Sequence, residues 1–119
     1  MVELAVRIGA LDLANPIMPA SGTFSPELAD VIDLNRLGAL VTKSATREFR
    51  AGNPTPRVAE TPSGMLNSIG IPSHGIDYFL NEIVPAYRKF TPPLVASISA
   101  HSPEAFASLC HDISVRDVD

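Results

Sequence analysis

Lys43 is the residue with the clearest chemical potential in this sequence, because it stands at the end of an apolar run. The letters ALV precede it, and Thr42 and Ser44 flank it with hydroxyl groups. In folds that alternate strands with helices, functional side chains gather at the carboxyl ends of strands. A lysine there can pair with an anionic group, act as a Schiff-base nucleophile or stabilise a reduced cofactor. A solvent-facing lysine at a strand end is the alternative interpretation.

Small and hydroxyl residues predominate at two further predicted strand ends. The segments are PASGT at residues 19–23 and ASISA at residues 96–100, and Lys43 is the only charged residue in either of them or in TKSAT at 42–46. Serine and threonine hydroxyls both donate and accept hydrogen bonds. Three such strand ends leave space and hydrogen-bonding groups for a flat ligand.

A long segment without helical or strand periodicity, residues 47–71, follows the lysine. Structureless loops longer than about 12–15 residues are usually functional or disordered. This one contains turn and apolar residues, so we expect it to fold back over the strand ends. Asn67 has a side chain that both donates and accepts, which suits an imide or amide ring. Gly70 would let the main chain approach a ligand closely, and a purely structural turn is the alternative.

The elements that must position these residues alternate along the chain. We predict a hairpin within residues 4–13, then buried strands at 16–20, 39–45 and 92–100. A helix follows each strand, beginning after Ser25, near residue 75 and after Ser102, and Pro85 should kink the second one. Strands that are apolar on both faces and alternate with helices predict an α/β fold with a parallel sheet.

The composition of the chain argues against several classes of protein. The chain has 119 residues, is 45% hydrophobic and carries a net charge of −4, which fits one domain without a nucleic-acid footprint. No stretch approaches the ~20 apolar residues of a membrane span, and the first residues do not resemble a signal peptide. The single cysteine, Cys110, shares a predicted helix face with Phe106 and Leu109, so we expect a core thiol. The histidines have no metal-site spacing, and a cytoplasmic protein fits best.

Three segments together resemble the FMN-containing catalytic subunit of class 1 dihydroorotate dehydrogenases. They are NPIMPASGTF, LVTKSATREFRAGNPTPRVAETPSGMLNSIG and PLVASIS, and the resemblance covers nearly the whole chain. ASGTF and ETPSGMLNSIG are closer to the NAD-dependent subtype than to the fumarate-using one. The resemblance implies a β/α (TIM) barrel. Because a complete barrel takes ~250 residues, residues 1–119 would be the amino-terminal part of that single domain, the hairpin and about three β/α units.

The resemblance also implies an activity, which is the flavin-dependent oxidation of dihydroorotate to orotate in pyrimidine biosynthesis. A base removes a proton from one ring carbon while hydride passes from its neighbour to FMN. The implied FMN contacts are Ala20, Ser21, Lys43, Ser44 and Ser97. The implied substrate contacts are Lys43, Asn67, Ser68, Ile69, Gly70 and Ile71.

Other implied features lie outside these residues. The family's base is a cysteine on a loop after the fourth strand, beyond residue 119, and Cys110 does not match its motif. The implied partners are dihydroorotate or orotate, a second copy of the chain, and an electron-transfer subunit with an iron–sulfur cluster and FAD. Neither a metal site nor a nucleic-acid site is expected within these residues.

The sequence departs from the family pattern at two places. Ser97 stands where asparagine is common in the third strand, and GIPSHG replaces GLQNPG or GLPNLG, which puts Ser73 in the place of asparagine. Two alternative hypotheses remain. One is a half-barrel without catalytic activity that serves in assembly, and the other is an aldolase-like barrel in which Lys43 forms a Schiff base.

Overall fold

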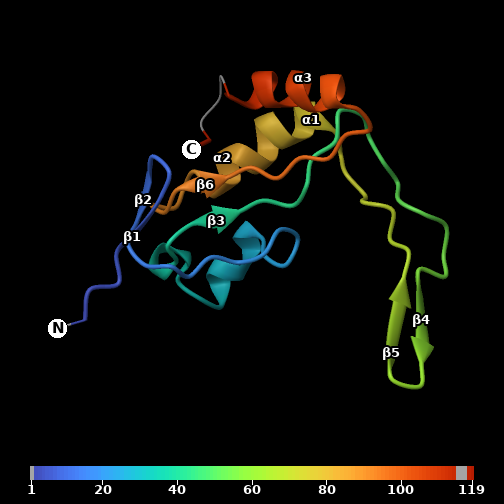
Figure 1. Cartoon of the computed structure of the whole chain (residues 1–119), viewed down its shortest axis with the longest axis horizontal. Helices are drawn as coiled ribbons and strands as arrows, with labels where there is room; N and C mark the ends of the chain where they lie inside the picture. Colours follow the sequence, from blue (N-terminus) through green and yellow to red (C-terminus); the bar gives the residue numbers. More distant parts are fainter. Residues whose placement is uncertain (1, 115–117) are drawn as a thin grey trace.

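The computed structural model describes residues 2–114 and 118–119 (Figure 1). Strands β1 (Val6–Ile8) and β2 (Leu11–Leu13) form the predicted antiparallel hairpin. Gly9 lies in its turn at φ +61°, a conformation that glycine adopts without steric cost. No helix among the described residues is long and apolar enough to cross a membrane.

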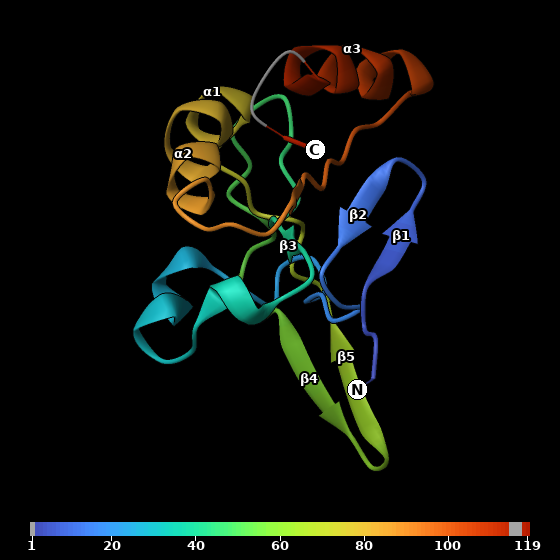
Figure 2. The ribbon, with the colours of Figure 1, turned by 90° about the vertical axis from the view of Figure 1, so that its left-hand side faces the viewer.

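A short parallel pair of strands forms the centre of the structure. Strand β3 (Leu40–Val41) pairs with β6 (Leu94–Val95), and an isolated parallel bridge follows from Ala45 to Ile98, shifted by one residue in register. Leu40 and Leu94 face each other in this register and are fully buried. Figure 2 shows helices α1 (Ile76–Tyr78) and α2 (Val84–Tyr87) on one side of β3 and the β1–β2 hairpin on the other. The predicted α/β class is confirmed, with two paired strands where three buried ones were expected.

The helical run between β3 and β6 in sequence is continuous from residue 76 to residue 87. It consists of α1 (Ile76–Tyr78), a π-helical turn η3 (Phe79–Ile83) and α2 (Val84–Tyr87). The predicted interruption at Pro85 therefore takes the form of a wider turn just before it. Proline lacks the N–H that would bond to the carbonyl four residues earlier, and a π turn accommodates that loss.

Helix α3 (Pro103–Ser114) begins as predicted, because the Ser102 hydroxyl accepts a hydrogen bond from Ala105 N at 3.2 Å. Its buried stripe is narrower than expected and consists of Leu109 and Ile113. The prediction of a core thiol was wrong, since Cys110 lies beside this stripe and is exposed.

Two predictions about the first β/α unit were also wrong. Residues 16–20 form no strand, and Ile17 is 61% exposed. Prolines at 16 and 19 have no N–H to donate, and the backbone bonds to the segment among the described residues are Gly38 N to Ile17 O and the turn bond from Thr23 N to Ala20 O. The long helix expected after Ser25 is divided into η1 (Pro26–Asp30) and η2 (Leu34–Arg36). The Asp33 side chain accepts from Asn35 N at 3.0 Å and so starts a separate turn.

The segment predicted to lack secondary structure contains a second hairpin. Strands β4 (Val58–Thr61) and β5 (Gly64–Asn67) pair in antiparallel fashion, and the Thr61–Gly64 pair closes a two-residue turn. Every residue of both strands is exposed, and the hairpin stands away from the body of the chain (Figure 1). The sequence analysis missed these strands because neither face of the hairpin is buried, so apolar and polar residues do not alternate along them.

The central pair should dominate stability. Replacement of Leu94, which is fully buried, by alanine should lower the free energy of unfolding by about 2–5 kcal/mol, because it leaves a cavity against Leu40. Urea unfolding measures this loss. The matched control is Leu66→Ala on β5, where the side chain is 67% exposed, and a loss as large there would contradict the assigned core.

Asp119 should make stability depend on pH. Its Oδ2 accepts from Leu94 N at 3.0 Å and Arg88 Nη1 at 2.8 Å, and these bonds, the first above all, hold its pKa below the ordinary 3.8. A lowered pKa stabilises the fold above pH 3.8, and that contribution is lost as the pH falls through the folded-state value.

The melting temperature should therefore fall less steeply between about pH 6 and pH 2 for Asp119→Asn than for the wild type. Asp30→Asn is the control, since that exposed carboxylate makes no hydrogen bond among the described residues. Equal slopes for Asp119→Asn and the wild type would contradict the assignment.

Candidate functional site

Hydroxyl groups from three separate segments meet at the carboxyl ends of β3 and β6. Ser44 Oγ lies 2.8 Å from Ser97 Oγ and 3.5 Å from Ser21 Oγ. The Ser21 hydroxyl also donates to the Thr42 carbonyl at 2.7 Å. We call Ser21, Ser44 and Ser97 the serine cluster. The cluster connects the turn at residues 20–23 with the ends of β3 and β6, two of the strand ends that the sequence analysis identified.

The parallel register explains why these serines meet. The buried Thr42 hydroxyl accepts a hydrogen bond from Ser97 N at 3.0 Å, and Ala45 N donates to Ser97 O at 2.9 Å. Ser97 is thus held by its backbone on both sides while its hydroxyl faces Ser44. The register shifts by one residue between the Val41–Val95 pair and the Ala45–Ile98 bridge, and the shifted register sets Ser44 opposite Ser97.

Lys43 lies against the same turn. A Cβ added at Gly22 would come within 3.1 Å of Lys43 Cδ and 3.9 Å of its Nζ, so the lysine passes directly over the glycine. Gly22 has φ +77°, and Thr23 N donates to Ala20 O at 3.1 Å to close the turn. Among the residues that the structure describes, Lys43 makes no ion pair, so its charge is available to an anionic ligand.

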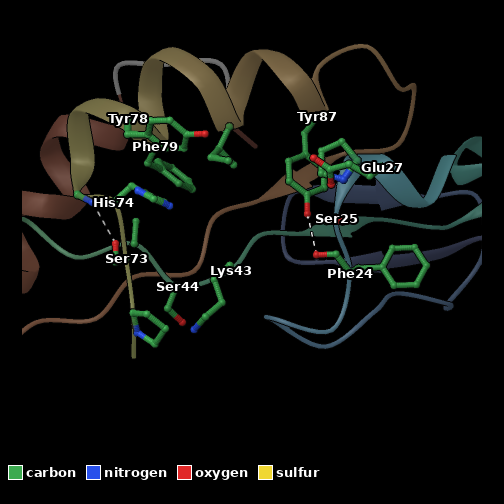
Figure 3. Close-up of a pocket in the computed structure, with 15 residues that line it drawn as sticks. Phe24, Ser25, Glu27, Lys43, Ser44, Ser73, His74, Tyr78, Phe79 and Tyr87 are labelled. Carbon is green, nitrogen blue, oxygen red and sulfur yellow. Dashed lines mark hydrogen bonds between the residues drawn. The ribbon is translucent and has the colours of Figure 1, made fainter. Parts of the chain in front are cut away.

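A cavity lies on the helix side of the strand end, and Lys43 and Ser44 are among the residues that line it. Figure 3 shows the Lys43 and Ser44 side chains pointing away from the helices, with the cavity on the helix side. The cavity measures about 230 Å³, and aromatic residues such as Phe79 and Tyr87 line it. Burial, and then the nearby Glu27 charge, raise the pKa of Tyr87, which donates its hydroxyl proton to Phe24 O at 3.1 Å. Tyr87 therefore serves packing and one hydrogen bond.

The predicted substrate segment lies at the base of the second hairpin. Asn67 is the last residue of β5, and its exposed side chain makes no hydrogen bond to a described residue. Ser68 is held by Asn53, whose Nδ2 donates to Ser68 Oγ at 2.7 Å and to Ser68 O at 3.2 Å. Asn53 N also donates to Ile69 O at 3.0 Å. The segment is ordered by its neighbour across the hairpin base.

Gly70 and Ile71 have left-handed backbone conformations, at φ +85° and +49°. A Cβ at Gly70 would come within 2.6 Å of Asn53 N, so glycine is required there by packing within the hairpin base. That reason differs from the predicted approach to a ligand. Ile71 adopts its conformation against its preference, which places strain beside the predicted substrate contacts.

Asn53 and Arg57 were missed as supporting residues by the sequence analysis. Arg57 Nε donates to Asn53 O at 2.6 Å, and its Nη2 donates to Ala51 O at 3.0 Å. The guanidinium thus braces the loop that carries Asn53, and Asn53 in turn holds Ser68. The signal was the segment GNPTPR itself, in which an asparagine and an arginine bracket two prolines.

The two predicted groups of contact residues lie in separate places. The predicted FMN contacts gather at the strand ends, and they are Ala20, Ser21, Lys43, Ser44 and Ser97. Residues 67–71, the predicted substrate segment, lie at the base of the projecting hairpin (Figure 1). No hydrogen bond joins the two groups among the described residues. They are connected through Ser73, whose hydroxyl accepts from Thr46 N at 3.1 Å.

Comparison with known proteins adds a family to this geometry. Residues 3–119 match a family model described as dihydroorotate dehydrogenase. Curated relatives named "dihydroorotate dehydrogenase B (NAD(+)), catalytic subunit" come from Desulforamulus reducens, with 46% identity over 118 residues, and Anoxybacillus flavithermus, with 47% over 116. These alignments cover 98% and 96% of this chain, but only 39% and 37% of the relatives.

The serine cluster should behave as one unit in a double-mutant cycle. Ser44→Ala and Ser97→Ala each remove the bond between their hydroxyls, so the double variant should be more stable than the summed single losses by about 1 kcal/mol. Urea unfolding of the four proteins measures this coupling energy. Ser44→Ala combined with Ser63→Ala, at the distant hairpin turn, should be additive. Additivity at Ser44 and Ser97 would contradict the contact.

Proposed function

The chain belongs to the dihydroorotate dehydrogenase family, and from this premise we propose that it forms part of an enzyme that oxidises dihydroorotate to orotate in pyrimidine biosynthesis. The observation that carries the proposal is the meeting of the serine cluster with Lys43 at the strand ends. The chain spans about 39% of the length of the relative from Desulforamulus reducens, so the activity is assigned to the whole protein. The relatives favour this chemistry over an assembly half-barrel or a Schiff-base aldolase.

In this proposal residues 1–119 supply the first part of a single β/α (TIM) barrel. The parallel pairing of β3 with β6, separated in sequence by helices, supports it, because a barrel of this class repeats that unit. The strand ends then form one sector of the barrel mouth, where the active sites of such barrels lie.

The strand ends fit FMN by their chemistry. The hydroxyls of Ser21, Ser44 and Ser97 can donate to and accept from the ring atoms of a flavin. Small residues at the turn, Ala20 and Gly22, leave space for a flat ring system. When bound, FMN supplies the acceptor for the hydride that leaves the substrate. These residues, with Lys43, form our proposed cofactor contacts.

Lys43 has two tasks in this arrangement. Its ammonium group lies over Gly22 and carries a charge without an ion-pair partner among the described residues. It can bind the anionic substrate by a charge-assisted hydrogen bond, and it can stabilise negative charge that develops beside it during oxidation. The same group therefore orients the substrate and favours electron transfer.

The hairpin base would complete the substrate pocket. Asn67 offers an amide that donates and accepts, which matches the alternating N–H and C=O groups of a pyrimidine ring. Ser68 and the backbone from Ile69 to Ile71 would lie beside it. We assign the proton-abstracting base to a residue outside this segment, because Cys110 lies on α3 and not at the strand ends.

Partner subunits form the last part of the proposal. The relatives are called catalytic subunits in their names, which supports a second kind of subunit. We propose that an iron–sulfur and FAD subunit carries electrons from this protein to NAD(+), and that the catalytic subunit is itself a homodimer, as the family resemblance implies.

Anaerobic addition of dihydroorotate to the flavin-loaded holoenzyme should bleach the flavin absorbance. Lys43→Ala should slow this bleaching by about ten- to a hundredfold, because a charge-assisted hydrogen bond is lost. Stopped-flow absorbance measures the rate. The control is Lys89→Ala, which removes the chain's other lysine from a position after α2. A flavin that dihydroorotate does not bleach in the wild type would contradict the proposed function.

A further inference from the structure

Ser73 is the residue at which the projecting hairpin returns to the body of the chain. We call residues 50–73, which include β4 and β5, the arm. Ser73 exchanges two backbone hydrogen bonds with Arg50 at the other end of the arm, at 2.8 and 2.9 Å. Its hydroxyl oxygen accepts from Thr46 N at 3.1 Å and from Gly75 N at 3.2 Å. One residue thus joins both ends of the arm to its two flanking segments.

The two groups that Ser73 holds are fixed by the core. Thr46 is 5% exposed and follows two residues after Ser44, at the end of the strand that carries the serine cluster. Gly75 is buried at φ +87° and precedes the first turn of α1. Ser73 therefore connects the arm to the strand end on one side and to the helix on the other.

Few other polar contacts hold the arm. Among the described residues, its remaining hydrogen bond to the rest of the chain joins Arg50 Nη1 to His101 Nε2 at 3.2 Å, between exposed groups. The arm's own strands are fully exposed and bury no apolar face. An isolated two-stranded hairpin has little stability of its own in water. The position of the arm therefore depends strongly on its base.

We propose that Ser73 is a positioning residue that sets the position of the substrate-lining end of the arm, Asn67 to Ile71, relative to the strand ends. This inference rests on the proposed function and goes beyond the residues that contact either ligand. The Ser73 oxygen already accepts two backbone N–H groups, so it acts through the position of the arm. Loss of the hydroxyl would leave the buried Thr46 N–H without its acceptor, a cost that favours movement of the arm.

The test compares Ser73→Ala, Ser73→Thr and Ser63→Ala in the flavin-loaded holoenzyme. Ser63 lies at the turn of the same arm, and its side chain makes no hydrogen bond among the described residues. Orotate affinity is read from the change in the flavin spectrum on titration. Hydrogen exchange at the Thr46 and Gly75 amides reports the bonds themselves.

Ser73→Ala should weaken orotate binding about tenfold and speed exchange at both amides, while the flavin content stays at the wild-type level. Ser73→Thr retains the hydroxyl and should restore both readouts, and Ser63→Ala should match the wild type. Where Ser73→Ala does not fold, Ser73→Cys carries the same test with a smaller expected loss, because sulfur is a weak acceptor.

The two proposals can fail separately. Faster exchange at Thr46 in Ser73→Ala with unchanged orotate affinity would overturn the positioning role and leave the proposed function intact. A loss of orotate affinity in Ser73→Thr as large as that in Ser73→Ala would likewise overturn the positioning role and leave the proposed function intact. A wild-type holoenzyme whose flavin spectrum does not respond to orotate would contradict the proposed function, and the inference about Ser73 would fall with it.

Discussion

The parallel pairing of β3 with β6 is the constraint on which the rest of the structure depends. It buries Leu40 against Leu94, and beyond a one-residue shift in register the same two segments place Ser44 beside Ser97. The Thr42 hydroxyl and the Ser97 amide then join the two strand ends directly. Because stability and the site rest on the same two neighbouring segments, the hydroxyl groups that could receive a ligand are set in place before any ligand binds. Such preorganisation lowers the cost of binding.

The two faces of the β3 end have different chemistry. Towards the helices lies a cavity with aromatic rings in its lining, and the Lys43 and Ser44 side chains point away from the helices (Figure 3). On that side Ser44 meets the other two residues of the serine cluster. On the second face the Lys43 side chain passes over Gly22, close to several hydroxyl groups that donate and accept hydrogen bonds. This polar face is therefore the one on which we propose that flavin and substrate bind.

Sequence alone predicted the features that depend on local pattern. Lys43 at a strand end, the helix start at Ser102 and the interruption at Pro85 were all confirmed. The prediction of a strand at 16–20 was wrong because apolar composition does not ensure a neighbouring strand with free backbone donors and acceptors. The second hairpin was missed because neither of its faces is buried, which removes the alternation on which strand prediction depends.

Supporting residues were the hardest to predict. Asn53 and Ser73 act through contacts with segments 15 and 27 residues away, and no periodicity marks such pairs. The family resemblance named the residues that would touch ligands, marked Ser73 only as a departure from the family's asparagine, and gave no role to Asn53. The structure separates the predicted contacts in space: the predicted FMN contacts lie at the strand ends, and residues 67–71 of the predicted substrate contacts lie on the arm.

The most direct measurement is a crystal structure of the holoenzyme with FMN and orotate. The account predicts the flavin on the polar face of the β3 end, with Lys43 Nζ within hydrogen-bond distance of both ligands and Asn67 against the orotate ring. A flavin that occupies the aromatic cavity on the helix side, or one remote from the serine cluster, would contradict it.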